Sequence, residues 1–427
     1  MYYSSNTLNA LKCIHMNKKL SISIIIVVGV IVVIGLFITA RSLSQNQYID
    51  DEVYVPQEYQ DVELGNDYSG PIKYDDSTLV YGADAPVYVT IYSHNEDSWS
   101  SLVNTPEHYE EYRTGLIERA ELLAEYGIEW NWQSDQPVIE AMIEYEDDGW
   151  LKALPGGLNV LEYLETLGAH FDPHAHSNNY ADIAYLIEQL GVKATGIIGG
   201  TVLIKCGTEH LGFLNLDSWY DNVGIESDGY VYGSDYPLAK WKPEILSDPG
   251  MGGHYYDEWS SGVWRPGDED KFYINFPDND IVYIGEGYPH DATVIGAEHA
   301  SGAEVHSEDG QYIKDLVGKI EDGDVPTGTS DGEKFMYTAS IHMRDTDVVS
   351  HEDSTVNTVE GIQSVLDELM PLVDSGQIIF VDYETAAEIW ETEYSEVPYR
   401  YDLFEFKFYK AVRDQAEGQC EEMAPSR

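Results

Sequence analysis

Four side chains that can bind a metal ion recur at every second position in the stretch from Ala169 to Ser177. They are His170, Asp172, His174 and His176. Alternate residues of an extended strand share one face, so this spacing predicts a strand with all four groups on the same side. Imidazoles two residues apart, next to a carboxylate, suit a borderline divalent ion such as Zn²⁺.

The alternative interpretation of this stretch is a polar, histidine-rich loop. Pro173 cannot donate a hydrogen bond to a sheet ladder, and Ser-Asn-Asn follows His176 at once. A metal or catalytic role is favoured, because loop composition alone seldom puts four such groups in phase.

Two further polar clusters follow apolar runs. The run from Pro86 ends in Ser-His-Asn-Glu-Asp at Asp97, and the run 335–341 ends in His-Met-Arg-Asp at Asp345. In barrels of parallel strands the carboxyl ends of the strands meet on one face, and that face holds the active site. We therefore expect the three clusters to lie together.

The elements that must position these clusters alternate along the chain. Periodicity, caps and glycine stops predict helices over 107–126, 158–167 and 180–190, the last with Asn179 as its cap. A capping box at Asn357 and Glu360 predicts a further helix that extends to about Met370. Apolar runs predict strands over 128–133, 192–198 and 378–381. The alternation indicates parallel βαβ units. It breaks between about 201 and 333, where the composition predicts a β-rich or irregular insertion.

The amino-terminal part predicts a membrane anchor. Leu20 to Ala40 is uncharged and rich in Ile and Val, and about 20 such residues cross a bilayer. Lysines precede this run and only Arg41 follows it closely, so the positive-inside rule places residues 1–19 in the cytoplasm and the rest of the chain outside. A cleaved signal peptide is the alternative, although the run is long for one and Ile-Thr-Ala is a poor cleavage site.

Composition limits the remaining classes. The chain has 427 residues, with 23 Lys and Arg against 77 Asp and Glu, and a formal net charge of -54. Such a surface repels nucleic acid and anionic lipid headgroups and is compatible with salty surroundings, so we expect no nucleic-acid partner. Three cysteines, at 13, 206 and 420, exclude a disulfide scaffold. Cys206 and Cys420 are either a pair or two free thiols.

The order of the polar clusters resembles that of the polysaccharide deacetylases, the NodB-like carbohydrate esterases. The segments that carry the resemblance are Glu96-Asp97, the histidines 174 and 176, Trp264-Arg265-Pro266, and Ile341-His342. The resemblance implies an α/β fold, a distorted (β/α)7-type barrel. It implies Glu96 as general base, His342 as general acid, and Asp97, His174 and His176 as ligands of a divalent metal, with Zn²⁺ the best match. Arg265 would orient the base, and Trp264 beside it would contact substrate.

A second resemblance competes with the first. His94-Asn-Glu-Asp-Ser-Trp99 is similar to the His-Asn-Asp-x-x-Trp signature of class II α-mannosidases, in which the His and the following acid bind zinc. Strand pleating puts His94 and Glu96 on one face and Asp97 on the other, which suits this version. Asp135 would then be the place to look for a nucleophile, with a helix cap or turn as its alternative role.

The sequence therefore predicts a membrane-anchored extracellular hydrolase that depends on a metal and removes acyl groups from a polysaccharide. The expected organisation is residues 1–19 in the cytoplasm, a transmembrane anchor over 20–40, an acidic tether over 41–85, the barrel over 86–395 with its insertion over 201–333, and a tail over 396–427. The alternatives are a glycoside hydrolase of the mannosidase type and a barrel that binds glycan without turnover.

Overall fold

The structure is a computed structural model of the chain. It describes residues 72, 74–82, 85–96, 103–146, 154–175, 179–199, 201–202, 227–228, 236–247, 249–250, 260–266, 274–287, 302–344 and 359–402. All of them belong to the compact unit Glu63–Arg427. The predicted membrane anchor over 20–40 and the three cysteines lie outside the described residues. Within the described ranges, no helix has the length and apolarity to cross a membrane.

A sheet of parallel strands forms the centre of the fold. Its order is β14-β2-β3-β4, and β15 pairs with the first half of β2. The strands are β2 (Val87–Asn95), β3 (Trp130–Ser134), β4 (Ala169–Pro173), β14 (Tyr337–Arg344) and β15 (Ile378–Phe380). β4 was predicted from the alternation of its polar side chains, and the others from apolar runs to within a few residues, because strands covered on both faces consist largely of apolar residues.

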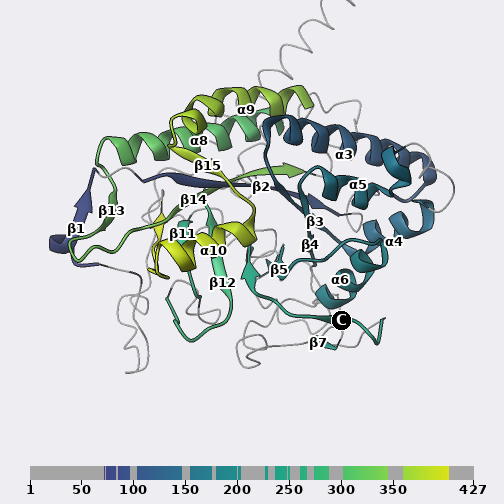
Figure 1. The fold of residues 1–427 in the computed structure, drawn as a ribbon, viewed down its shortest axis with the longest axis horizontal. Coiled ribbons are helices and arrows are strands. Elements are labelled where there is room, and N and C mark those ends of the chain that lie inside the picture. The colour runs from purple at the N-terminus through teal and green to yellow at the C-terminus, as the bar shows by residue number, and fades with distance from the viewer. Residues whose placement is uncertain are drawn as a thin grey trace, which may run out of the picture. The chain divides into compact units, whose positions relative to one another are not determined.

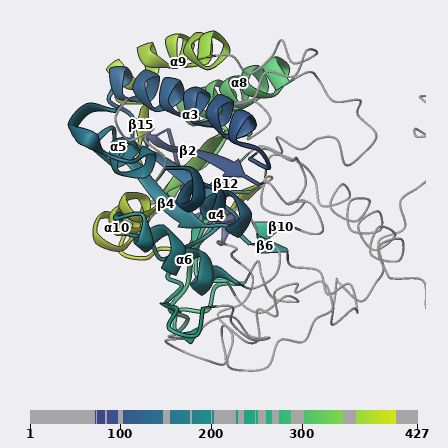
Figure 2. The same cartoon turned by 90° about the vertical axis from the view of Figure 1, so that its right-hand side faces the viewer.

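Helices precede or follow these strands along the chain and lie on both sides of β2 (Figures 1 and 2). They are α3 (Pro106–Tyr126), α4 (Gln136–Tyr145), α5 (Val160–Thr166), α6 (Tyr180–Gln189), α8 (Gly302–Glu321), α9 (Val359–Asp374) and α10 (Tyr383–Glu393). Figures 1 and 2 both show α3, α8 and α9 on one side of β2 and α10 on the other. Local signals set the ends of the helices. Gly127 stops α3 in the left-handed conformation, as expected, and Asn159 and Glu162 form a capping box on α5 that was not predicted.

The predicted insertion contributes to a second sheet. Its order is β16-β11-β12-β9-β5, with β5, β9 and β12 parallel and β11 antiparallel to both of its neighbours. The strands are β5 (Ile197–Ile198), β9 (Ile245–Leu246), β11 (Ser260–Trp264), β12 (Val282–Glu286) and β16 (Tyr401–Asp402). One expectation is therefore corrected, because the insertion predicted to be β-rich or irregular also contains the long helix α8. The segment 396–427 contributes β16.

The two sheets meet at both ends without closing a barrel. Parallel bridges from Phe171 to Ala194 and from His174 to Gly199 continue β4 toward β5. At the other end, the backbone N–H of Thr338 donates to Ser261 Oγ over 2.9 Å, and Ser340 Oγ donates to the Glu286 carbonyl over 3.1 Å. Among the described strands no ladder joins β14 to β11 or β12. The mixed α/β class is confirmed, whereas the described strands do not form the predicted closed barrel.

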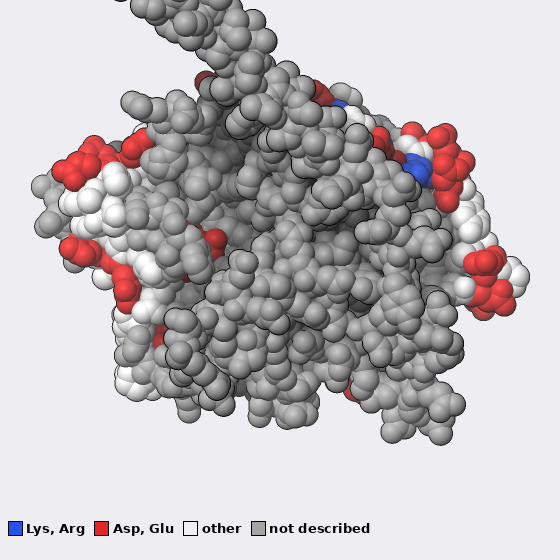
Figure 3. Space-filling model, turned by 180° about the vertical axis from the view of Figure 1, so that it is seen from behind, with Lys and Arg blue, Asp and Glu red and all other residues white. Residues whose placement is uncertain are grey.

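Short strand pairs and two 3-10 turns complete the described structure. β1 (Leu79–Tyr81) pairs with β13 (Pro326–Thr329), β6 (Thr201–Val202) with β10 (Pro249–Gly250), and β7 (Ser227–Asp228) with β8 (Lys240–Trp241); the turns are Asp76–Thr78 and Pro155–Gly157. β1 lies within 41–85, the segment expected to be a tether with some local structure. Figure 3 shows acidic side chains at both sides of the described surface and few basic ones, as the net charge of -54 implies.

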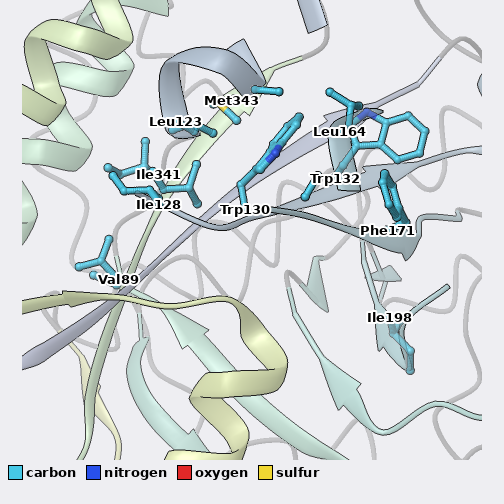
Figure 4. Packing of buried hydrophobic residues seen from close by; sticks show 14 of the residues in the cluster. Val89, Leu123, Ile128, Trp130, Trp132, Leu164, Phe171, Ile198, Ile341 and Met343 are labelled. Atoms are coloured by element: carbon cyan, nitrogen blue, oxygen red, sulfur yellow. The ribbon is translucent and has the colours of Figure 1, made fainter. Parts of the chain in front are cut away.

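Alternation along the strands separates an apolar face from a polar one. The face toward α3, α8 and α9 carries Val89, Trp130, Trp132, Phe171 and Ile341, all buried and packed together (Figure 4). The opposite face of the same strands carries polar residues: Thr90, His94, Asn131, Gln133, Asp172, Ser340 and His342. A polar interior at the ends of parallel strands is where this architecture holds its chemistry.

Candidate functional site

The end of β2 places His94 and Glu96 on the polar face. Asn95, between them, faces the opposite side, where it accepts a hydrogen bond from Tyr112 of α3 over 3.0 Å. Its side-chain amide donates to the Gln133 carbonyl of β3 over 2.9 Å. Since neighbouring residues of a strand point to opposite faces, this anchor fixes His94 and Glu96 toward the interior.

The end of β4 brings His174 to the same place. Its backbone N–H donates to the Ser134 carbonyl over 2.9 Å, and its bridge to Gly199 holds it beside the second sheet. A Cβ at position 199 would lie 2.5 Å from Gln133 Oε1, so a larger residue there would have to displace the buried Gln133 side chain. The His174 side chain is completely buried.

These three side chains form a compact group of possible metal ligands. His174 Nε2 lies 2.7 Å from Glu96 Oε1, and the rings of His94 and His174 have centroids 4.3 Å apart. One ligand atom of each residue lies within 4.8 Å of the others. Glu96, 18% exposed, opens the group toward solvent, while both histidines are buried.

The donor set fits a borderline divalent ion. Two imidazoles and one carboxylate are the usual protein ligands of a catalytic zinc, which keeps a further position for water or substrate. The residues come from the ends of two strands that β3 separates, so the sheet holds their spacing. His94, Glu96 and His174 therefore fit a metal without a large rearrangement.

His342 of β14 lies beside this group. Its ring centroid is 4.6 Å from that of His94, and its ring stacks on Tyr92 at 4.7 Å with 17° between the planes. Tyr92 donates from its hydroxyl to Glu286 Oε2 over 2.6 Å, and Tyr383 donates to the other oxygen. Glu286 is buried. The hydrogen bonds of Tyr92 and Tyr383 to Glu286 thus fix the Tyr92 ring on which the His342 ring stacks.

Asp172 holds the strands together and does not join the ligand group. It accepts hydrogen bonds from Thr195 Oγ1 over 2.7 Å, from Gln133 Nε2 over 3.2 Å, and from Asn131 Nδ2 at both of its oxygens. Burial raises the pKa of the Asp172 carboxyl well above its usual range, and these hydrogen bonds oppose that shift. His170, earlier on β4, contacts Glu129 and Asp382 instead.

The structure does not bring Arg265 and Trp264 to this group. Because β11 is antiparallel to β12, Trp264 pairs with Tyr283 near the start of β12, at the edge where the parallel strands begin. Arg265 donates to Glu391 and Glu396 at the far end of α10, over 2.9 and 3.2 Å. Trp264 is completely buried against Tyr283. The expectations that Arg265 orients Glu96 and that Trp264 contacts substrate are therefore corrected.

Two candidate helix caps have different outcomes. Asp135 Oδ1 accepts from the backbone N–H of Val138 over 3.2 Å and caps α4, which is the alternative role foreseen for it. Asn179 lies at the cap position of α6, but its side chain donates to Gln136 Oε1 over 2.7 Å, and α6 has no side-chain cap.

Two predicted ligands are not described by the structure, and several residues of the site were not predicted. Asp97 and His176 lie outside the described residues, so their roles stay predictions. Sequence reasoning did not assign His94 to the expected ligand set, although its alternation with Glu96 indicated it. It also missed Tyr92, Glu286 and Tyr383, which come together only through the second sheet and α10.

Comparisons with known proteins found one distant structural likeness. No protein-family model matches the sequence, and no curated protein is similar enough to match. One solved structure with a similar arrangement is described as "Crystal structure of putative polysaccharide deacetylase from Mycobacterium smegmatis". It is 8% identical, has a TM-score of 0.36, and the match covers 76% of this chain and 95% of that one. So distant a likeness carries no functional argument, and the case for a function depends on the site.

Proposed function

We propose that this chain is a metal-dependent hydrolase that removes acyl groups from a carbohydrate polymer. The observation that carries the proposal is the meeting of His94, Glu96 and His174 at the carboxyl edge of the first sheet, with His342 beside them. Hydrolysis at a metal requires protein ligands for the ion, a nearby group that can transfer a proton, and access from solvent, and this site offers all three.

Each residue has a distinct part in this proposal. His94, Glu96 and His174 hold a divalent ion, Zn²⁺ by donor type, and Asp97 and His176 are further candidate ligands. When bound, such an ion polarises an acyl carbonyl and lowers the pKa of a water to about 7. His342 donates a proton to the departing sugar oxygen, and Tyr92 holds its ring in place.

The role of Glu96 differs from the general base that the family resemblance implies. Its Oε1 contacts His174 Nε2 directly at 2.7 Å, and a bound ion would take the place of this contact with both atoms as its ligands. Glu96→Gln separates the two roles. We expect this variant to lose metal together with activity; a variant that keeps its full metal content and loses only turnover would make Glu96 the base.

The proposal is tested by measuring acetate release from acetylated polysaccharides by the full-length chain. We expect acetate after loading with Zn²⁺, none after chelation, and none from His174→Ala. A chain that binds no metal under saturating Zn²⁺ would contradict the proposal.

A glycosidase of the α-mannosidase type is the second candidate, because His94 joins Glu96 as that resemblance implies. A retaining glycosidase also needs a carboxylate nucleophile about 5 to 5.5 Å from its acid/base carboxyl. Asp135, the candidate for that role, already caps α4. Release of reducing sugar from a glycan without acyl groups, abolished in Asp135→Asn, would favour the glycosidase.

We further propose that residues 20–40 anchor the hydrolase to the membrane, with the sheets outside the cell. The support is the uncharged run and the lysines before it. Protease added to intact cells should then cleave residues 60–427. Protection of this region until lysis would contradict the topology, and a mature chain that begins near Arg41 would replace the anchor by a signal peptide.

A further inference from the structure

A second group of possible metal ligands lies at the opposite edge of the first sheet. It consists of Glu129, directly before β3, His170 at the start of β4, and Asp382 at the start of α10. One ligand atom of each residue lies within 4.8 Å of the other two. We propose that this group binds a second divalent cation, of the Zn²⁺ class, which fastens α10 to the sheet.

The spacing of the ligand atoms supports a cation between them. His170 Nε2 lies 3.6 Å from Glu129 Oε2 and 4.0 Å from Asp382 Oδ2. Both distances lie within ion-pair range but exceed the roughly 2.7 to 3.2 Å of a hydrogen bond, so His170 Nε2 is hydrogen-bonded to neither of these oxygens. Two atoms bound tetrahedrally to one zinc at about 2.0 to 2.2 Å are roughly 3.4 Å apart, which is close to the observed spacing.

Asp382 is built into the fold so that one oxygen faces the group. Its side chain is 2% exposed. Oδ1 accepts from the backbone N–H of Thr385 over 3.0 Å and caps α10, while Oδ2 faces His170. Within the part of the chain that the structure describes, no hydrogen bond reaches Oδ2. A cation between the three side chains would give this carboxylate oxygen a close partner of opposite charge.

The backbone around each ligand is held in place. The N–H of Tyr383 donates to Asn131 Oδ1 over 3.1 Å and the N–H of Val381 donates to the Val89 carbonyl over 3.0 Å, so both neighbours of Asp382 are fixed to strands. A Cβ at Gly168, where φ is +91°, would lie 3.3 Å from Glu129 Cγ. Glycine there lets the Glu129 side chain pass close to the chain that leads into β4.

The ligand types indicate the class of ion. One imidazole and two carboxylates suit Zn²⁺ or Mn²⁺, whereas Ca²⁺ and Mg²⁺ prefer sites built from oxygen alone. Glu129 is 58% exposed, so the ion has access from solvent and can keep water ligands on that side. Because the ligands come from residues 129, 170 and 382, the ion would join the beginning of the sheet to the last described helix.

Zinc titration of the purified full-length chain, after chelation, tests this proposal. The variants are His170→Ala, Glu129→Gln and Asp382→Asn. Glutamine keeps the shape of an exposed side chain, and asparagine is as good a helix cap as aspartate, so neither should unfold the protein. The matched controls are His108→Ala and Glu144→Gln, which change exposed residues outside the group.

We expect one bound Zn²⁺ fewer, or affinity at this site weakened by about 100-fold or more, in each of the three variants and in neither control. These three variants should still release acetate at the wild-type rate. They should also keep the other Zn²⁺, the one that His174→Ala loses. If the three variants of this site each lose one Zn²⁺ and His174→Ala loses none, the second site is supported and the proposed function fails. Unchanged stoichiometry and affinity in all three variants would overturn it, as would equal losses in the controls.

Discussion

The two ends of β4 both present a histidine on the same strand face, yet their surroundings differ. His174 is buried at the carboxyl end, with a carboxylate at 2.7 Å and another histidine ring at 4.3 Å. His170 near the amino end is 28% exposed, with carboxylates at 3.6 and 4.0 Å. Four residues of strand separate the two by about 13 Å. Residues in phase on a strand therefore share a face without sharing a site.

The neighbours of each histidine explain the division. At the carboxyl end the partners come from β2 and β14, two parallel strands that end at the same edge. At the amino end one partner, Asp382, also caps a helix. In β/α folds the carboxyl edge carries the chemistry and the other edge contributes mainly stability. This comparison leads us to expect activity to depend on His174 and structural metal binding to depend on His170.

The strongest test of the comparison is His174→Ala. Loss of a completely buried ligand should remove nearly all hydrolysis and one bound metal ion, because the remaining ligands hold the ion weakly. Acetate release and metal content measured on the same sample check both effects. His170→Ala is the matched variant at the other end, and its rate should stay within about twofold of the wild type. Similar losses of rate in both variants would show that His174 and His170 do not differ in their importance for activity.

The next largest effect is expected for His342→Ala. Its ring lies beside His94, and removal of a general acid usually costs about 10² to 10⁴-fold in rate. Metal content should not change, since His342 is not among the three ligands. A loss of metal together with rate would instead make His342 a ligand.

Tyr92→Phe should have a smaller effect and act mainly on stability. The phenyl ring can still stack under His342, but Glu286 loses one of its two phenol donors. A buried acceptor that loses a partner costs about 1 to 3 kcal/mol of unfolding free energy. Urea unfolding measures this cost, with Tyr88→Phe as control because, among the described residues, the Tyr88 hydroxyl has a single hydrogen-bond partner, Tyr394, over 3.4 Å. A fully stable Tyr92→Phe would show that the Glu286 contacts are not structural.

The sequence was sufficient for the elements that carry their own signals. Runs such as Val87–Asn95 and stops such as Gly127 depend on neighbouring residues, so β2 and α3 were predicted nearly to their ends. Helix α8 was missed although Tyr312, Ile313, Leu316, Val317 and Ile320 are buried at helical spacing. The Gly- and Asp-rich segments around α8 obscured this period.

The site could be predicted only in part, because much of it depends on how strands pair. Order along the chain indicated Glu96, His174 and His342, which end parallel strands. The same reasoning failed for Arg265, because β11 runs antiparallel and reverses the edge at which it ends. The second group depends on contact between residue 382 and the starts of β3 and β4, and no local pattern contains that contact.

The smallest effect is expected for Asp135→Asn, which decides between the two hydrolase types. Asp135 caps α4 through Val138, and asparagine caps a helix about as well, so unfolding free energy should change by less than about 0.5 kcal/mol. Asp135→Ala, which cannot cap, should cost about 1 kcal/mol. In an acyl hydrolase both variants keep acetate release within about twofold, since the carboxylate takes no part in the reaction. In a retaining glycosidase Asp135→Asn would instead lose its nucleophile and nearly all turnover at unchanged stability. Measuring urea unfolding and turnover on the same two variants therefore separates a role of Asp135 as helix cap from a role as nucleophile. A loss of rate in Asp135→Asn without a loss of stability would overturn the deacylase proposal.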